Sequence, residues 1–558
     1  MKIKAFTIIA AAAVFMACTP PVSKDFRIIH NNDGTDMLAN LWFGSRPLTL
    51  DDVNAAVDMV AGTQVTTYMM CTGSSATYYR SAISNMLGDD RGGALVNAYD
   101  SATYAIYKRY WDNAIALESQ GTDMISASLK RAKSHGLETF ITIRLNDLHF
   151  ADTTNACKMA MEDFWLKNPQ YWTNDASIGY NSSGAYDYSH PEVRSHKLSL
   201  IQEQIGLYGG LIDGVDLDFM RFIVYFKADS ARANMPLMTD FVKKVREMVD
   251  SASHSLGRPL LLSARVAPSV AENEAHGLDI KEWLKLGLLD FVSIGTHWRG
   301  DPAMPVGQFR KDLGDLLNVP LYGSIDDGGF RSSAPGASRE FWTHGALRGM
   351  ASYILSQGAD GLYLFNYYFG RYYEKQHKAE EGEQSTPQYD RVICPQMLQE
   401  LGSIETLRRR NKVYALSDGH NQYGIKPNTP LPIKLSSNHT KSDILSSSAS
   451  CSMYIGDDPI ADKARRAVIF VRKTKGECAV SCNGELLTAT CPEDVSRYSK
   501  DLYLGDNEEV LALEIPVRCL RKGDNEFLFQ LSPKCSGVNV VRMELLLDYG
   551  PVETNGYF

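Results

Sequence analysis

Short apolar runs alternate with amphipathic stretches from residue 26 to residue 410. Each run is followed by a polar loop and then by a segment with apolar positions three or four residues apart, which is typical of a helix with one buried face. This alternation predicts parallel strands joined by helical crossovers. The predicted strands are 26–31, 64–71, 138–144, 211–219, 259–266, 288–295, 320–325 and 361–365. Eight strands are the number that a closed (β/α)8 TIM barrel needs, so we predict that fold over residues 26–410.

The helices expected between these strands have clear 3.6-residue periods. They are 50–60, 121–134, 191–208, 236–253, 280–286 and 341–356. Residues 72–119, which follow the second strand, form a Tyr-rich insertion that the periodicity does not resolve. Because barrels build their binding face from loops at the strand C-termini, we expect this insertion to shape the site.

Helical periodicity ends near residue 410. The runs 467–471, 478–482, 486–489, 511–516, 526–530 and 538–547 have the character of strands. We therefore predict an all-β sandwich of jelly-roll type over residues 411–558. The phrases NGELL at 483–487 and LRKGDNE at 520–526 resemble accessory domains of the galactose-binding type. That resemblance implies a domain that binds sugar or braces the barrel, and we favour bracing.

The N-terminus has the layout of a secretory signal. Lys2 and Lys4 precede an apolar run over residues 5–17, which is too short to span a bilayer. The phrase FMAC ending at Cys18 resembles a bacterial lipoprotein box, which implies lipid attachment at Cys18. We predict a signal peptide over 1–17, a tether over 18–25, and an exported lipoprotein on the periplasmic or cell-surface side of the outer membrane. The alternative is an ordinary signal peptide with an incidental cysteine.

Composition narrows the function classes. Lys and Arg number 57 against 66 Asp and Glu, a net charge of −9. This excludes a nucleic-acid binder that relies on overall positive charge, because phosphates require clustered cations. Six of the ten cysteines lie in the predicted sandwich, enough for up to three disulfides in an exported domain: Cys451, Cys478, Cys482, Cys491, Cys519 and Cys535.

The most specific chemical signal is the phrase DGVDLDFMR at residues 213–221. Side chains alternate along a strand, so Asp216 and Asp218 share one face, which can point into the barrel. Buried carboxylates need a cation, a metal or an acid/base role. Arg221, just beyond, is placed to keep one of them ionised. The alternative is a structural Asp–Arg network that ties the fourth strand to its neighbours.

The same phrase resembles the chitinase signature DGxDxDxE, but Met220 occupies the position of the catalytic acid, which removes that mechanism. A better match is to bacterial TIM barrels related to the glycosyl-hydrolase-like ten family. The supporting phrases are FRIIHNNDG at 26–34, RLND at 144–147, FWLKNPQYW at 164–172, YDYSHPEVR at 186–194, GLDIKEW at 277–283 and GADGLYLFNY at 358–367. The resemblance implies a barrel that hydrolyses glycosidic bonds.

Polar residues at the other strand ends suit sugar recognition, which uses amides, charges and aromatic plates. We expect eight residues to bind substrate: Arg144, Asn146, His149, Asp216, Arg221, Arg265, His297 and Asn366. Trp298, Asp327 and Tyr367 stand beside them. Taken singly, a histidine is more often structural, and an Asp-Asp-Gly is more often a turn.

Glycoside hydrolysis needs one carboxyl group to protonate the leaving oxygen and another to attack or to activate water. We assign Asp218 as one member, with Asp326 as the preferred partner and Glu272 as the second choice. The predicted partner is a carbohydrate substrate, and the sequence indicates no particular protein partner.

Two alternatives to this hydrolase remain open. HExxH, P-loop, nucleophile-elbow and paired CxxC motifs are absent from the sequence, so we expect neither metal nor cofactor. Asp216 and Asp218 with His149 or His297 form the weak metal-binding alternative. The other alternative is a surface glycan-binding lipoprotein whose barrel has lost catalysis.

Overall fold

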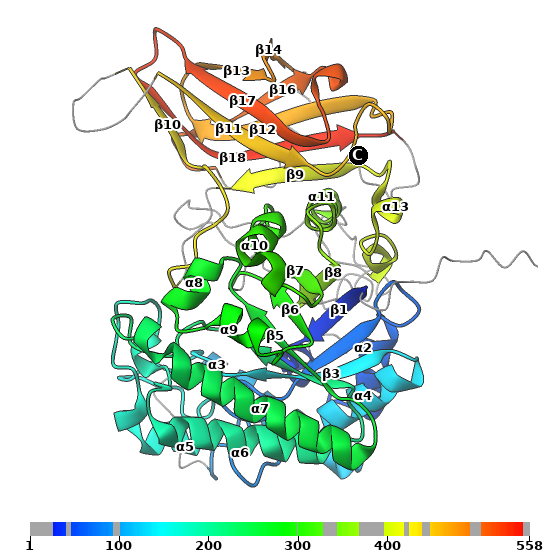
Figure 1. Cartoon of the computed structure of the whole chain (residues 1–558), viewed down its shortest axis with the longest axis vertical. Coiled ribbons are helices and arrows are strands. Elements are labelled where there is room, and N and C mark those ends of the chain that lie inside the picture. The colour runs from blue at the N-terminus through cyan, green and yellow to red at the C-terminus, as the bar shows by residue number, and fades with distance from the viewer. Residues whose placement is uncertain are drawn as a thin grey trace, which may run out of the picture.

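The computed structural model describes residues 26–40, 46–92, 101–297, 300–326, 343–367, 395–417, 423–437, 447–490 and 504–550. Within them, parallel strands close into a barrel whose neighbours follow chain order from β1 to β8 (Figure 1). The strands are β1 Arg27–Asn32, β2 Thr67–Cys71, β3 Glu138–Arg144, β4 Gly214–Asp218, β5 Leu261–Val266, β6 Phe291–Ile294, β7 Leu321–Asp326 and β8 Gly361–Phe365. The predicted (β/α)8 barrel is confirmed.

Helices pack around the outside of this barrel (Figure 1). They are α1 Thr35–Ala39, α2 Leu50–Asp58, α3 Ser101–Ser119, α4 Met124–Ser134, α5 Asp163–Lys167, α6 Pro191–Tyr208, α7 Met235–Leu256, α8 Val270–Ala275, α9 Ile280–Lys285, α10 Val306–Leu313, α11 His344–Ser356 and α13 Ile404–Leu407. Short 3-10 turns are η1 Pro169–Tyr171, η2 Ser182–Gly184, η3 Arg232–Asn234, η4 Gly314–Leu316, η6 Pro395–Gln399 and η7 Val517–Cys519. Several of these helices begin directly after a residue whose side chain caps the first backbone N–H groups of the helix. At α2, for example, Thr49 and Asp52 form a reciprocal capping box.

The barrel interior is layered along the strand direction. At its base Arg27 pairs with Glu138 and packs on Phe291. Above this pair lies a hydrophobic cluster whose Phe365 reaches up to the Arg265 guanidinium: Ile29, Met69, Phe140, Phe291, Tyr322, Tyr363 and Phe365. Inward positions nearer the C-terminal ends carry hydroxyl and then charged groups, as along β5, where Leu261, Ser263 and Arg265 follow one another. The lower layer is tightly filled, since a Cβ on Gly214 would lie 2.1 Å from Phe140 Cε1. A polar site is therefore supported from below by a close-packed core.

The C-terminal domain is a sandwich of two antiparallel sheets, as predicted. One has the order β10-β18-β12-β16-β15 with β9 paired to β18, and the other has the order β11-β17-β13-β14. The strands are β9 Lys412–Ser417, β10 Ile433–Ser436, β11 Ser448–Ile455, β12 Arg466–Thr474, β13 Cys478–Cys482, β14 Glu485–Leu486, β15 Thr488–Ala489, β16 Glu508–Ile515, β17 Gly523–Leu531 and β18 Gly537–Asp548. The sequence pattern missed β9, β10 and β11.

The sandwich packs on the barrel through β9, which lies along α11 (Figure 1). Two fully buried networks secure this contact. In one, Arg348 of α11 donates to Glu400 and to the carbonyl oxygen of Asn411. In the other, Asp457 accepts hydrogen bonds from Lys412 and Tyr549 at one oxygen, and from Tyr414 and Ser352 at the other. Removal of one partner from such a network is costly, so the sandwich braces the barrel.

Several predicted features lie outside the part of the chain that the structure describes. They are Cys18 with the signal and tether, Trp298, Asp327, Cys394 and Cys491. The described cysteines of the sandwich carry free thiols: Cys451, Cys478, Cys482, Cys519 and Cys535. Among the described helices, none has both the length and the apolar character needed to cross a membrane.

The close approach of α11 to β9 yields a stability prediction. A Cβ on Gly349 would lie 1.9 Å from the carbonyl oxygen of Val413, so Gly349→Ala must push the sandwich away from the barrel. We expect the free energy of unfolding in urea to fall by about 1–3 kcal/mol, the usual cost of overpacking. The control is Gly206→Ala in α6, where a Cβ meets nothing within 4 Å. Equal stability of the two variants would contradict this packing.

Candidate functional site

Asp218 ends β4 with a fully buried side chain. Arg265 Nε and Nη2 donate to its two carboxylate oxygens, each over 3.0 Å, and the backbone N–H groups of Met220 and Arg221 donate to Oδ1 over 2.9 and 3.1 Å. The strand register places Arg144 and Arg265 on the two strands that flank Asp218. The guanidinium paired with Asp218 is therefore that of Arg265 and not, as the sequence suggested, that of Arg221. This pair ties the fourth strand to the fifth.

The side chain of Arg221 instead begins a hydrogen-bonded chain across the mouth of the barrel. Its Nη2 lies 2.8 Å from Nε2 of His149, and Nδ1 of His149 lies 2.6 Å from Oδ1 of Asp147. Arg144 Nη1 donates to the other oxygen of Asp147 over 2.9 Å. Burial alone would raise the pKa of Asp147, but the charges of His149, Arg144 and Arg221 outweigh burial and hold that pKa below its usual range.

The same chain continues to the first and last strands. Arg144 Nη2 donates to Asp33 Oδ2 over 3.0 Å, and Asn366 Nδ2 donates to the same oxygen over 3.1 Å. Asp33 follows β1 and Asn366 follows β8, so strand ends that are far apart in the sequence share one network. Predicted residues Arg144, His149, Arg221 and Asn366 are thus brought together.

His149 is where this network reaches solvent. Its side chain is 42% exposed, whereas the side chains of Arg144 and Asp147 are 1% and 0% exposed. Its two ring nitrogens contact Arg221 on one side and Asp147 on the other. The arrangement presents an imidazole, oriented from both sides, to an incoming ligand.

Aromatic rings form one wall of the mouth. The ring of Phe222 lies 5.1 Å from that of His149 and 4.6 Å from that of His297. His297 is buried, which lowers its pKa well below the usual range, and its Nδ1 lies 3.2 Å from the carbonyl oxygen of Met220. Tyr423, from the connection between β9 and β10, packs on both His297 and Phe222. The C-terminal domain therefore contributes a side chain to the mouth.

The predicted partner carboxylate, Asp326, is buried at the end of β7. Burial alone would lower the pKa of Arg265, but the negative charges of Asp218 and, more weakly, Asp326 contribute to holding it above its usual value. The charge of each predicted catalytic carboxylate thus acts on the Arg265 guanidinium, which pairs directly with Asp218. Glu272 stands apart from them, with Oε1 accepting from the backbone N–H of Lys426 over 2.8 Å.

Asn146 points to backbone and not toward the other predicted binding residues. Its Nδ2 donates to the carbonyl oxygens of Val224 and Tyr186, and its Oδ1 accepts from the backbone N–H of Tyr186. These contacts fix the loops that follow β3 and β4. Asn146 therefore holds the wall of the site through neighbouring backbone.

Asp216 lies one inward position below Asp218 and is fully buried. Ser263 donates to one of its oxygens over 2.7 Å, and Tyr363 donates to the other over 3.0 Å. Burial, reinforced by the charge of Asp218, raises the pKa of Asp216 to about 6. Asp216 is consequently a buried acid beneath the mouth.

The metal-binding alternative finds no matching geometry. Asp216 is bonded to hydroxyl groups and Asp218 to a guanidinium, while His149 and His297 face Arg221 and a backbone carbonyl. Within the described ranges, no group of three or more His, Cys, Asp or Glu side chains is arranged to hold an ion.

Several buried donors at the mouth have no acceptor among the described residues: Arg144 Nε, Arg221 Nε, Arg265 Nη1, Ser293 Oγ and Ser324 Oγ. Two of them lie close to Gly295, where an added Cβ would come within 3.2 Å of Ser324 Oγ and 3.6 Å of Arg265 Nη1. An unmet buried donor costs about 1–3 kcal/mol, so this region favours a ligand or water that brings acceptor oxygens.

Sequence reasoning missed two acidic residues after β1. Asp33 joins the network through Arg144 and Asn366. Asp36 is buried, and burial together with the charge of Asp33 raises its pKa well above the usual range. The strand-end rule that singled out Asp218 and Asp326 would also have found Asp33, because it follows the first strand directly.

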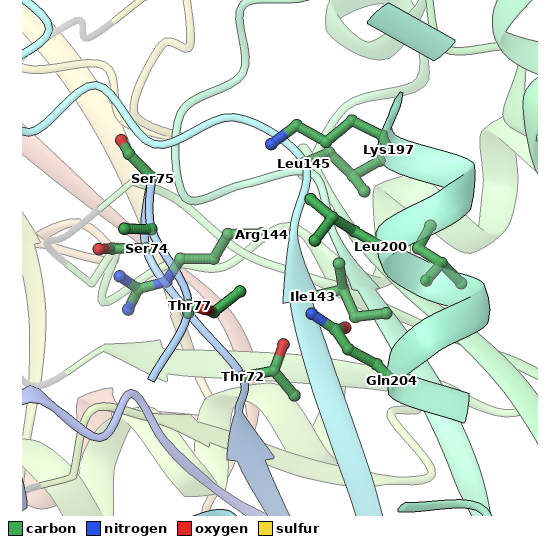
Figure 2. A pocket seen from close by; sticks show the side chains of 13 residues that line it. Thr72, Ser74, Ser75, Thr77, Ile143, Arg144, Leu145, Lys197, Leu200 and Gln204 are labelled. Atoms are coloured by element: carbon green, nitrogen blue, oxygen red, sulfur yellow. The ribbon is translucent and has the colours of Figure 1, made fainter. Parts of the chain in front are cut away.

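A small cavity of about 30 Å³ lies behind Arg144. Figure 2 shows it between the loop after β2, the end of β3 and the face of α6 that carries Lys197, Leu200 and Gln204. Its volume is about that of one water molecule in the liquid, so no sugar ring fits there.

No protein-family model and no curated protein sequence matches the chain. Among solved structures, an alpha-L-fucosidase from Bacteroides thetaiotaomicron matches at 10% identity and a TM-score of 0.34, over 92% of each chain. A beta-glucosidase from Pyrococcus furiosus matches at 10% identity and 0.32, over 62% of this chain and 86% of that one. A cycloisomaltooligosaccharide glucanotransferase from Paenibacillus matches at 8% identity and 0.32, over 93% of this chain. The chain spans 57% of the glucanotransferase's length.

The raised pKa of Asp216 predicts a pH dependence of stability. The folded protein keeps this proton up to a pH of about 6, whereas the unfolded chain releases it near pH 4, so ionisation destabilises the fold as pH rises through this window. We expect Asp216→Asn to gain up to about 3 kcal/mol relative to the wild type between pH 4 and pH 7. Urea unfolding at both pH values measures the difference. Parallel pH profiles of the two proteins would contradict the assignment.

Proposed function

We propose that the protein is a glycoside hydrolase that acts on a poly- or oligosaccharide at the C-terminal mouth of the barrel. The observation that carries this proposal is the set of buried donors without acceptors beside Asp218, Arg265 and Asp326. Sugar hydroxyl groups supply acceptors at several points of one ring. Phe222 and Tyr423, each 3% exposed, pack on each other and form the aromatic wall behind His149.

Asp218 and Asp326 are the proposed catalytic carboxylates. They lie at the ends of β4 and β7 around Arg265. Arg265 pairs with Asp218, and the charge of Asp326 also acts on its guanidinium. In the proposed reaction one of the two carboxyl groups protonates the leaving oxygen and the other attacks or activates water. Arg144, His149, Arg221, His297 and Asn366 are proposed to bind the substrate, directly or through the network that joins them.

A second candidate is a glycan-binding protein without catalysis. It is favoured by one observation: both oxygens of Asp218 are occupied by Arg265 and backbone donors, and the side chain is closed to solvent. For catalysis, substrate must displace one of these donors. Binding alone has no such requirement.

Digestion of a glycan panel with product analysis tests the hydrolase. For any glycan that the wild type cleaves, we expect Asp218→Asn and Asp326→Asn each to lower kcat by about 10²–10⁴-fold, the usual contribution of an acid or base. The control is Asp213→Asn, since Asp213 lies at the opposite end of β4 against Lys133 and Thr139. Full activity of both mouth variants would sink the proposed pair. Binding of a glycan without cleavage by the wild type would establish the second candidate.

We also propose that the protein is an exported lipoprotein anchored through Cys18. The support is the charged, apolar and small-residue order of residues 2–18. Attachment by lipid predicts that Cys18→Ala moves the protein from the membrane fraction to the soluble fraction of the producing cell. Labelling with a fatty-acid analogue checks the same point, and equal labelling of the variant would refute the anchor.

A further inference from the structure

A groove of about 670 Å³ lies beside the mouth. It is bounded by the loop that carries Tyr180, the loop after β4, helix α8 and the chain at Tyr423. This volume is in the range of small-molecule sites, about 300–1,000 Å³. The groove combines apolar and polar surface, because Glu272 and Ser177 line it together with the two tyrosines.

We propose that this groove is a second sugar-binding subsite, which holds the part of a neutral oligosaccharide that extends beyond the barrel mouth. The inference deepens the proposed function and rests on it for the identity of the ligand. Three features mark the groove as a subsite: the contact of Tyr423 with the mouth, the exposed ring of Tyr180, and the bonds that hold the chain at Tyr423.

Tyr423 separates the groove from the mouth. It lines the groove, and its ring also contacts Phe222 and His297, with centroids 5.8 and 5.3 Å away. Phe222 in turn contacts the solvent-accessible His149. A row of packed rings therefore connects the exposed His149 with the groove, although Phe222 and Tyr423 are each only 3% exposed. The mouth and the groove thus adjoin each other on the two sides of this aromatic wall.

Tyr180 is the accessible plate of the groove. The residue is 61% exposed, so its ring is open to a ligand in the groove. Its position is fixed from the backbone, because the Tyr423 hydroxyl donates to the Tyr180 carbonyl oxygen over 3.0 Å. Gly179 allows this approach, since a Cβ there would lie 2.9 Å from the Tyr423 ring.

The chain around Tyr423 is held at a conformational cost. Tyr423 has a φ of 53°, a left-handed conformation that is rare for a bulky residue and typical of functional sites. Glu272 accepts from the N–H of Lys426 over 2.8 Å, and Asp301 accepts from the N–H of Asn428 over 2.7 Å. These carboxylates, Glu272 on α8 and Asp301 on the loop after β6, keep the segment against the barrel.

A larger groove in the sandwich offers a contrast. It measures about 810 Å³ and is lined by Lys473, Glu509, Cys478 and their neighbours. Its lining contains no aromatic ring. The groove beside the mouth is therefore the better match to a chain of sugar rings, whose apolar faces pack on aromatic side chains.

Calorimetric titration of the full chain tests the subsite. The probes are gluco-, manno-, galacto- and xylo-oligosaccharides of two and six sugar units. For the series that binds, we expect Tyr180→Ala to weaken affinity for the six-unit chain by about three- to ten-fold, the worth of one aromatic contact. Affinity for the two-unit sugar should change less than two-fold. The substitution keeps the Tyr180 carbonyl and so retains the bond from Tyr423.

Leu207→Ala is the control, because Leu207 is similarly exposed, at 54%, on α6. Equal losses for short and long sugars, unchanged affinity for the long chain, or no binding by any series would each overturn the subsite. Product analysis of each titrated sample reports cleavage separately from binding, so failure of the hydrolase proposal is distinguishable from failure of the subsite. A wild type that binds six-unit chains through Tyr180 and never cleaves them would retain the subsite and lose the hydrolase.

Discussion

The ion pair between Asp218 and Arg265 is the contact on which the mouth of this barrel depends. Both side chains are fully buried, and neither charge would be tolerated there alone. Loss of one partner from such a pair typically costs about 3–5 kcal/mol, because the other charge is left without compensation. The surrounding charges are arranged around the pair, with Arg144 on the neighbouring strand and Asp326 within electrostatic reach of the guanidinium.

This constraint explains why the barrel interior is graded. The aromatic layer supplies close packing, the hydroxyl layer satisfies Asp216, and the uppermost layer carries Asp218 and Arg265. Charges at the top can use solvent and ligand to complete their hydrogen bonds, whereas at the base Arg27 and Glu138 complete theirs with each other and with Tyr322 and Thr67. His149 marks the transition, since it belongs to the buried network and is also exposed. The sandwich supports the site in two ways: β9 packs along α11, and the connection after β9 supplies Tyr423 to the wall of the mouth.

The sequence alone predicted most of the barrel. The predicted strands 138–144 and 361–365 have the same bounds as β3 and β8. In both, a dense apolar run lies between glycine or polar residues, so the sequence marks where the strand begins and ends. Alternation also placed Asp216 and Asp218 on one inward face. By contrast, the prediction missed β11 (SASCSMYI), although its apolar residues alternate with polar ones, because small residues and serines make the alternation weak. The strand is stabilised by pairing with β17.

Partners within the site could not be predicted in the same way. Arg221 is adjacent to Asp218 in sequence, yet its guanidinium reaches His149, 72 residues earlier, while Arg265 takes the carboxylate. These choices follow from strand register and loop paths, which local patterns do not specify. No sequence pattern indicated that Tyr423 belongs to the site, because it lies in a connection between two strands of the sandwich that returns to the barrel.

The most direct measurement of the central claim, that the mouth recognises sugar, is a crystal structure of the wild-type chain with a non-hydrolysable thio-linked oligosaccharide of the series that it binds. The account predicts a sugar ring at the mouth, with oxygens at hydrogen-bond distance, below about 3.2 Å, from His149, Arg221 Nε or Arg265 Nη1. Sugar density confined to the sandwich, with the network from Arg221 to Asn366 unchanged and unoccupied, would contradict it.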